Sequence, residues 1–140
     1  MESLSLTSQS LKTGKVVVVL NGRYTGRKAV VVQTFDKGTK ARPFGHALIA
    51  GVDRYPLRVH KKMTLKRIAA RSHVKPFVKA INFSHLMPTR YGLDIDLSAV
   101  NPENATDKGR KASIRRKVTR AFEERYKSGK NRWFFTKLRF

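Results

Sequence analysis

Two glycines followed at once by two bases could form a loop that binds a nucleotide phosphate. Gly22 and Gly26 lie in the segment LNGRYTGRKAVVV, which spans positions 20–32. The phosphate-binding loop of ATPases and GTPases requires G-x-x-x-x-G-K-[ST], because the final hydroxyl coordinates magnesium. Here the glycines are one residue too close together, and Ala29 takes the place of the hydroxyl. The pattern instead predicts a tight turn between two strands, in which glycine supplies positive φ.

The other residues that could support catalysis or bind a metal are scattered or ordinary in context. The four histidines lie at least twelve residues apart and there is no cysteine, so the spacing of a zinc site is missing. Asp94 and Asp96 would share one face of a strand, and we interpret them as a surface pair. We therefore expect no metal, no cofactor and no enzymatic activity.

The net charge indicates the class of partner. Thirty-one Lys and Arg stand against nine Asp and Glu, which gives a formal charge of +22. Such an excess of like charge strains a compact monomer, so a polyanion that neutralises it is the expected partner. No apolar run approaches the roughly 18 residues of a membrane span. The first residues, MESLSLTSQSLK, lack the features of a secretory signal and predict a flexible polar leader.

The bases are unevenly distributed along the chain. Residues 54–93 contain ten Lys or Arg and no acid, and residues 108–140 contain thirteen against two glutamates. Globular surfaces normally mix both signs, so an acid-free stretch of this length predicts a face turned to phosphate. A solvated cationic face and a membrane-surface helix are the alternatives. The spread of the bases over strands, loops and helices argues against a single amphipathic membrane helix.

The elements that would position these bases follow from periodicity. Short Val-rich runs predict three strands and suggest a small barrel or sandwich; they lie at Lys15–Leu20, Lys28–Phe35 and His46–Val52. We expect a helix at Lys61–Ser72 with Leu65, Ile68 and Ala69 on one stripe, then a strand at Phe77–Phe83. Pro88 is expected to end the next segment, and Asp94–Leu97 to add a short strand.

A longer helix is predicted towards the C-terminus. It could begin at Asn101-Pro102 and is best defined from Arg110 to Lys127. Its apolar stripe comprises Ile114, Val118, Ala121, Phe122 and Tyr126, and its opposite face carries Arg116, Arg120 and Lys127.

Three adjacent aromatics, Trp133 to Phe135, follow this helix. They could stack on unpaired bases or close a hydrophobic core. We favour the core, because three adjacent exposed aromatics would promote aggregation.

Several segments together resemble one known family. GKVVVVLNGRYTGRKAVVV resembles the KOW motif, an RNA-binding strand–turn–strand of small SH3-like barrels. HALIAGVDRYP at 46–56, SHLMPTRY at 84–91 and FEERYKSGKNRWFFTKLRF at 122–140 extend the likeness. From about Gly14 to Phe140 the chain resembles the eukaryotic family of large-subunit ribosomal proteins numbered twenty-seven. The family usually opens with a few basic residues and Pro-Gly-Lys, whereas this chain has a longer neutral leader, so RNA contacts of the family's extreme N-terminus are not carried over.

The resemblance implies a mixed α+β fold with an SH3-like β-barrel, a basic linking helix and a C-terminal helical extension. It divides the chain into a flexible leader (1–13), a KOW barrel with the inserted helix (14–97), and a C-terminal helix with an aromatic and basic tail (98–140). It implies a structural role in the large ribosomal subunit, with large-subunit rRNA and neighbouring ribosomal proteins as partners and with no membrane or small-molecule substrate. The location would be cytoplasmic ribosomes, reached by way of the nucleus and nucleolus.

The charge distribution and the resemblance together give the expected RNA-binding residues. Gly22 and Gly26 would form the turn, and the bases would contact phosphate by charge neutralisation, with modest base specificity. These bases are Lys15, Arg23, Arg27, Lys28, Arg54, Arg58, Lys61, Lys62, Lys66, Arg67, Arg71, Arg90, Arg110, Lys111, Arg115, Arg116, Arg120, Lys130 and Arg132. The alternative function is a KOW-type factor that cycles on and off RNA. An RNA-directed enzyme is disfavoured because the sequence offers no nucleophile, metal cluster or acid pair.

Overall fold

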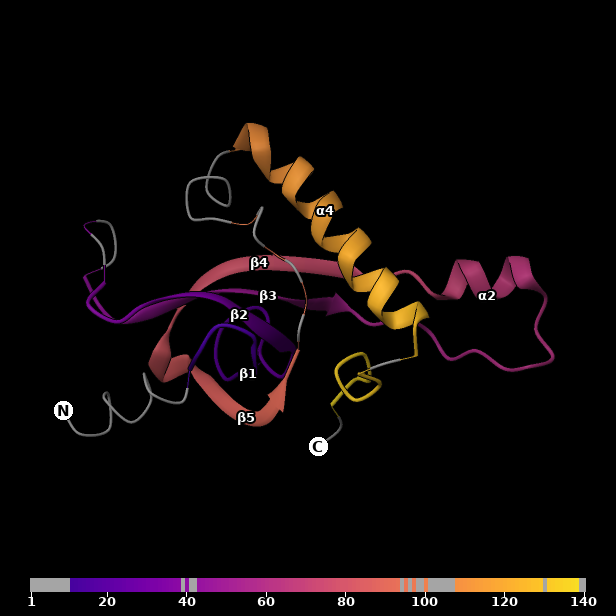
Figure 1. Cartoon of the computed structure of the whole chain (residues 1–140), viewed down its shortest axis with the longest axis horizontal. Coiled ribbons are helices and arrows are strands. Elements are labelled where there is room, and N and C mark those ends of the chain that lie inside the picture. Colours follow the sequence, from indigo (N-terminus) through magenta and orange to yellow (C-terminus); the bar gives the residue numbers. More distant parts are fainter. Residues whose placement is uncertain are drawn as a thin grey trace.

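The fold is mixed α+β, built on one antiparallel sheet (Figure 1). The computed structural model describes residues 11–38, 40, 43–93, 95, 97, 100, 108–129 and 131–138. The five strands are β1 (Lys15–Val19), β2 (Lys28–Phe35), β3 (His46–Arg54), β4 (Lys75–Asn82) and β5 (Leu86–Gly92). The helices are α2 (Leu65–Arg71), the 3-10 turn η1 (Phe83–His85) and α4 (Lys108–Lys127).

The sheet is open in the part of the chain that the structure describes. Its strand order is β4-β3-β2-β1-β5, which leaves β4 and β5 at opposite edges. All of the pairings between neighbours are antiparallel. The expected α+β class is therefore confirmed, whereas the described strands do not close into the expected barrel.

Both faces of the sheet are buried, which explains why β1 reads as an unbroken run of valines. Val17 and Val19 pack on one face with Ile49 and Phe77. Val16 packs on the other face, in the cluster that includes the apolar stripe of α4. A strand with one face in water would instead alternate apolar and polar residues.

Helix α4 lies across one face of the sheet (Figure 1). Its predicted stripe is confirmed at Ile114, Val118 and Phe122, which are 5%, 0% and 0% exposed. Phe134 and Phe135 follow the helix and contact Phe122 with ring centroids 5.6 and 6.2 Å away. These two phenylalanines are buried, so they close the core as the sequence analysis favoured.

Several expected elements differ from the structure. Pro88 lies inside β5 rather than ending a segment, which is possible because β5 is an edge strand with one neighbour. Ile95 and Leu97 are not in a strand, and Asp94 and Asp96 lie outside the described residues.

The start of the C-terminal helix and the end of the N-terminal leader also differ from their predicted positions. Helix α4 begins at Lys108 among the described residues, whereas the expected start at Asn101-Pro102 falls outside them. Of the leader expected to be flexible, residues 1–10 lie outside the described part, and Leu11 is 1% exposed within the core.

The apolar stripe predicted on α2 is not part of the core. Leu65 is 85% exposed, and the helix contains no buried residue. Helical periodicity identified the helix correctly, and Ile68 on this stripe is only partly buried.

Gly51 on β3 is required by close packing rather than by its backbone angles. A Cβ there would lie 2.6 Å from the Phe77 ring and 2.7 Å from both the Ala29 Cβ and the Lys28 carbonyl oxygen. We predict that Gly51→Ala lowers the free energy of unfolding by about 1–3 kcal/mol, as overpacking does. Urea denaturation would measure it. Gly92→Ala is the control, since a Cβ there makes an ordinary 3.6 Å contact. Equal stability of the two variants would contradict the prediction.

Candidate nucleic-acid interface

The turn between β1 and β2 is closed by backbone hydrogen bonds. Gly26 N donates to Val19 O at 2.7 Å, and Val19 N donates to Arg27 O at 3.0 Å. Gly22 and Gly26 have φ values of 94° and 82°, a region that L side chains rarely adopt. Both glycines thus adopt, within this turn, the backbone conformation that glycine allows.

Tyr24 fixes this turn against the sheet. Its ring lies flat on Phe77 of β4, with centroids 4.0 Å apart and planes 5° apart. Three cations surround the same ring: Arg23, Arg27 and Lys79 lie 5.5, 5.9 and 5.8 Å from its centroid. A cation this close to an aromatic face is attracted by the ring quadrupole, so the stack also positions the charges.

Arg27 is held by an internal ion pair. Its Nε lies 3.0 Å from Asp53 Oδ1 and also donates to the Asp53 backbone oxygen at 3.0 Å. Lys75 Nζ lies 3.8 Å from the other carboxylate oxygen. The charge of Arg27 is thus partly offset by Asp53, and its hydrogen bonds tie the turn to the end of β3.

A cationic cleft lies between the turn, the start of β4 and α4. The cavity has a volume of about 290 Å³. We call this cavity the cationic cleft, because four bases line it: Arg23, Lys75, Lys111 and Arg115. Asp53 is the one acid among the described lining residues, and it is paired. Four cations around one cavity form a site that complements phosphate.

The cleft joins residues that are far apart in the sequence. The turn and α4 were each predicted to carry RNA-binding bases, and the structure brings Arg23 together with Lys111 and Arg115. Lys75 was missed as a site residue. It lies in the acid-free stretch 54–93, which was the available signal.

A second set of predicted bases lies on the solvent-facing side of α4. Arg116 and Arg120 are exposed and line a groove of about 350 Å³ together with Glu124 and with Lys117, which was not predicted as a site residue. The opposite face packs in the core. Arg116 and Arg120 are therefore available to a partner without disturbing the packing of the helix.

The arm, which we define as residues 55–72, connects β3 to β4 and carries α2. Figure 1 shows α2 beyond the end of the sheet. The base of the arm is tied by Leu57 N donating to Arg71 O at 2.8 Å and by Arg71 Nε donating to Arg58 O at 2.6 Å. Arg71 is partly buried there. The exposed predicted bases of the arm are Arg58, Lys61, Lys62, Lys66 and Arg67, and Arg54 is exposed beside it.

Lys28 requires a correction. It was expected beside RNA, but its residue is 1% exposed. Its Nζ donates to the carbonyl oxygens of Trp133 and Thr136, both at 2.5 Å, and lies 3.9 Å from the centre of the Trp133 ring. Two carbonyls and an aromatic face satisfy the ammonium inside the protein, so it cannot reach a phosphate.

The remaining predicted bases are distributed around these surfaces. Lys15 and Arg90 lie beside a second, larger cavity. Arg110 and Arg132 are exposed, and Lys130 lies outside the described residues. Trp133 is partly buried and stacks on Tyr91 with centroids 4.5 Å apart.

Other kinds of site find no support in the described part of the chain. Its His, Asp and Glu residues do not gather in a group of three that could hold a metal ion. None of its helices is both long and apolar enough to span a membrane.

Comparison with known proteins gives consistent matches over most of the chain. The model of the family described as "Ribosomal L27e protein family" matches residues 16–140. The large ribosomal subunit protein eL27 of Pisum sativum is 53% identical over 131 residues, which cover 93% of this chain and 97% of the relative. The large ribosomal subunit protein eL27B of Schizosaccharomyces pombe is 52% identical over 132 residues, with the same two coverages of 93% and 97%.

The burial of Lys28 leads to a test that separates packing from RNA contact. We predict that Lys28→Met lowers the free energy of unfolding by about 1–3 kcal/mol, because two carbonyl oxygens lose their donor. The salt dependence of RNA binding should stay unchanged, because the ammonium does not face solvent. Denaturation and RNA titration at several salt concentrations measure both. If Lys28→Met leaves the free energy of unfolding unchanged but reduces the slope of log affinity against log salt, the prediction is wrong and Lys28 contacts RNA.

Lys28 should also make stability depend on pH. Burial lowers its pKa from 10.5 to about 8, so between these values the unfolded state binds more protons than the folded state. The penalty for the buried charge is full below about pH 8 and fades as the pH rises towards the unfolded pKa. Burial raises the pKa of neighbouring Tyr55, which therefore stays protonated in this range. We predict that wild type gains stability relative to Lys28→Met from about pH 7.5 to about pH 9.5. A constant difference would contradict this.

Proposed function

This chain belongs to the ribosomal L27e protein family, and from that premise we propose that it is a structural constituent of the large ribosomal subunit. The observation that carries the proposal is the identity of 53% and 52% to proteins named for that subunit, over 93% of the chain. The proposal assigns the chain a role in holding RNA and no catalytic residue.

The proposed partner is folded rRNA, bound mainly through its phosphates. The formal charge of +22 requires a polyanion on a large part of the surface. The cationic cleft, the exposed face of α4 and the arm offer bases on three elements, so the RNA would contact several sides of the protein. Release of counterions would supply much of the affinity and make it strongly dependent on salt. Double-stranded RNA is read chiefly through backbone, 2′-hydroxyl groups and shape, which agrees with a surface rich in charge.

We also propose that β1, its turn and β2 act as a KOW element of SH3-like character. The sequence likeness and the glycine turn support this, while the described sheet itself is open. The division into a leader, a sheet domain and a C-terminal extension remains part of the proposal. Since α4 and the sheet share one hydrophobic cluster, the last two parts would act as one body.

Neighbouring ribosomal proteins are the second class of partner in this proposal. Leu57 and Leu65 of the arm are 58% and 85% exposed, and they offer apolar contacts among the bases. The protein would work in cytoplasmic ribosomes, after passing through the nucleus and nucleolus during assembly.

The resemblance of the turn to KOW factors favours one alternative, a factor that cycles on and off RNA. Sedimentation through a sucrose gradient separates the two functions. We predict that the chain stays with large subunits after a high-salt wash, because contacts on several sides must break together. Release of the chain by the wash, with intact subunits left behind, would favour the cycling factor.

The phosphate-binding role of α4 can be tested with a double variant. We predict that Arg116→Ala/Arg120→Ala weakens RNA binding and reduces the slope of log affinity against log salt by roughly 2, at about 0.9 per phosphate contact. Stability should be unchanged or slightly higher, because the two arginines are an i,i+4 pair of like charge.

Lys37→Ala/Lys40→Ala is the matched control, since it removes two exposed bases outside the proposed surface. Equal losses of affinity in the two double variants would show that only net charge matters. Loss of folding without a change in slope would refute the assignment of Arg116 and Arg120.

A further inference from the structure

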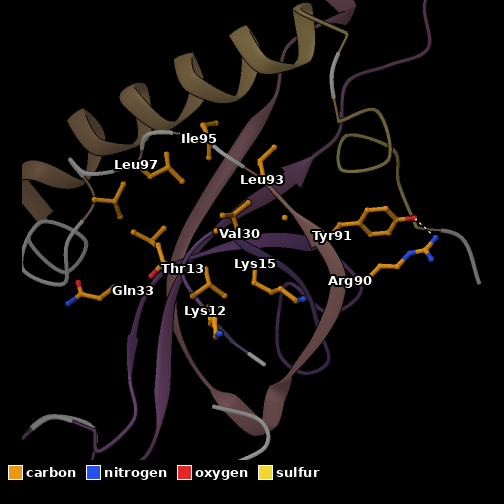
Figure 2. A pocket seen from close by; sticks show the side chains of 15 residues that line it. Lys12, Thr13, Lys15, Val30, Gln33, Arg90, Tyr91, Leu93, Ile95 and Leu97 are labelled. Atoms are coloured by element: carbon orange, nitrogen blue, oxygen red, sulfur yellow. Dashed lines mark hydrogen bonds between the residues drawn. The ribbon is translucent and has the colours of Figure 1, made fainter. Parts of the chain in front are cut away.

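A second, larger cavity lies away from the cationic cleft. It has a volume of about 900 Å³ and opens between the chain before β1, the middle of β2 and the segment from β5 onwards. Figure 2 shows Leu93, Ile95 and Leu97 on the side towards α4. Val30 contributes to the floor. Val30, Leu93 and Leu97 are 2%, 3% and 8% exposed, so they close the bottom of the cavity and a ligand would lie at its mouth, against the more exposed lining residues.

The rim of the cavity is cationic. Lys12, Lys15 and Arg90 lie around it, opposite the apolar side chains (Figure 2). None of the described residues that line the cavity is acidic. Gln33 adds an amide that can both donate and accept hydrogen bonds. The lining therefore complements a molecule that combines negative charge with a flat, mostly apolar body and a polar edge.

An aromatic platform continues from this rim. Tyr91 is 40% exposed, and its ring is supported from behind by stacking on Trp133 at 4.5 Å. Arg90 lies over the same ring at 5.4 Å and approaches the Tyr91 hydroxyl at 3.5 Å. Aromatic rings and arginine planes next to each other are the groups on which unpaired bases stack.

An acidic peptide would fit the cavity less well than a nucleotide. Val30 and Val31 lie inside the sheet and pair with strands on both sides, and Gly14 N donates to Val31 O at 2.8 Å. On the β2 side of the cavity an extended peptide would therefore bury its own amides without partners, although β5 on the other side is an edge strand. A base carries its polar groups on one edge and needs only apolar contact on its faces.

We propose that this cavity binds an unpaired nucleotide of the RNA, with the base on the exposed part of the Tyr91 ring at the mouth of the cavity and the flanking phosphates at Lys12, Lys15 and Arg90. The inference rests on the proposed RNA-binding function and adds to it a site that contacts a base. The cationic cleft would contact the phosphates of any strand. This cavity would bind a strand that carries bases more tightly than one that lacks them.

The experiment compares two oligomers of equal charge on the full-length chain. One is a decamer of uridine, and the other is a decamer of abasic ribose phosphate. We expect the wild-type chain to bind the uridine decamer about tenfold more tightly, the order of one stacked base. Thr13→Phe places a ring in the cavity from an exposed position and should abolish this preference while leaving the abasic affinity unchanged. Thr136→Phe, at an exposed position outside the cavity, is the control and should keep the preference.

A crosslink gives a readout that needs no variant. A decamer containing 4-thiouridine should crosslink on irradiation to peptides that contain residues 12–15 or 90–93. Crosslinks confined to other peptides, or a preference that persists in Thr13→Phe, would overturn the site.

Two further outcomes separate the possible failures. Equal, salt-sensitive binding of both decamers would refute the nucleotide site and leave phosphate binding intact, whereas no salt-sensitive binding of either would refute the proposed function itself. A decapeptide of alternating Asp and Leu that competes on wild type but not on Thr13→Phe would assign the cavity to a protein segment instead.

Discussion

The buried ammonium of Lys28, the first residue of β2, joins this central strand to the last described turn of the chain. Its bonds to the carbonyls of Trp133 and Thr136 hold that turn on the sheet, where Phe134 and Phe135 meet Phe122 of α4. One wall of the cationic cleft is α4, and the other is the turn that precedes Lys28. The distance between these walls therefore depends on an interaction that lies in neither of them.

The same arrangement shows how the chain handles its excess of positive charge. Arg27 is paired with Asp53, the Lys28 ammonium is held by two carbonyl oxygens and an aromatic ring, and most other bases are exposed. Charge near the core is thus satisfied internally, and charge at the surface is left for a partner. The fold does not need to balance its bases one by one, because their mutual repulsion at the surface is relieved by a polyanion.

The sequence predicted most of the helices and strands, but not which of their side chains other segments would cover. The spacing of Ile114, Val118 and Phe122 identified a helix with a buried face, and Gly22 and Gly26 identified the turn. Arg27 and Lys28 look equivalent in the sequence, yet one is a third exposed and the other is buried, because a segment about a hundred residues later covers only Lys28. Periodicity also placed an apolar stripe on α2, but it cannot reveal whether another element is there to receive it. The larger cavity could not be foreseen, since it depends on how distant segments meet.

The absence of any buried side chain in α2 has a consequence for how this surface can change. A helix of seven residues gains little stability alone, and α2 gains none from hydrophobic packing on the sheet. Helix α2 is therefore only weakly coupled to the core, whereas the start of the arm is tied to it, because the Tyr55 hydroxyl accepts from Lys28 N at 2.9 Å. Insertions, deletions and charge changes between residues 60 and 67, most of which are exposed, would alter the reach of the molecule at little cost to global stability.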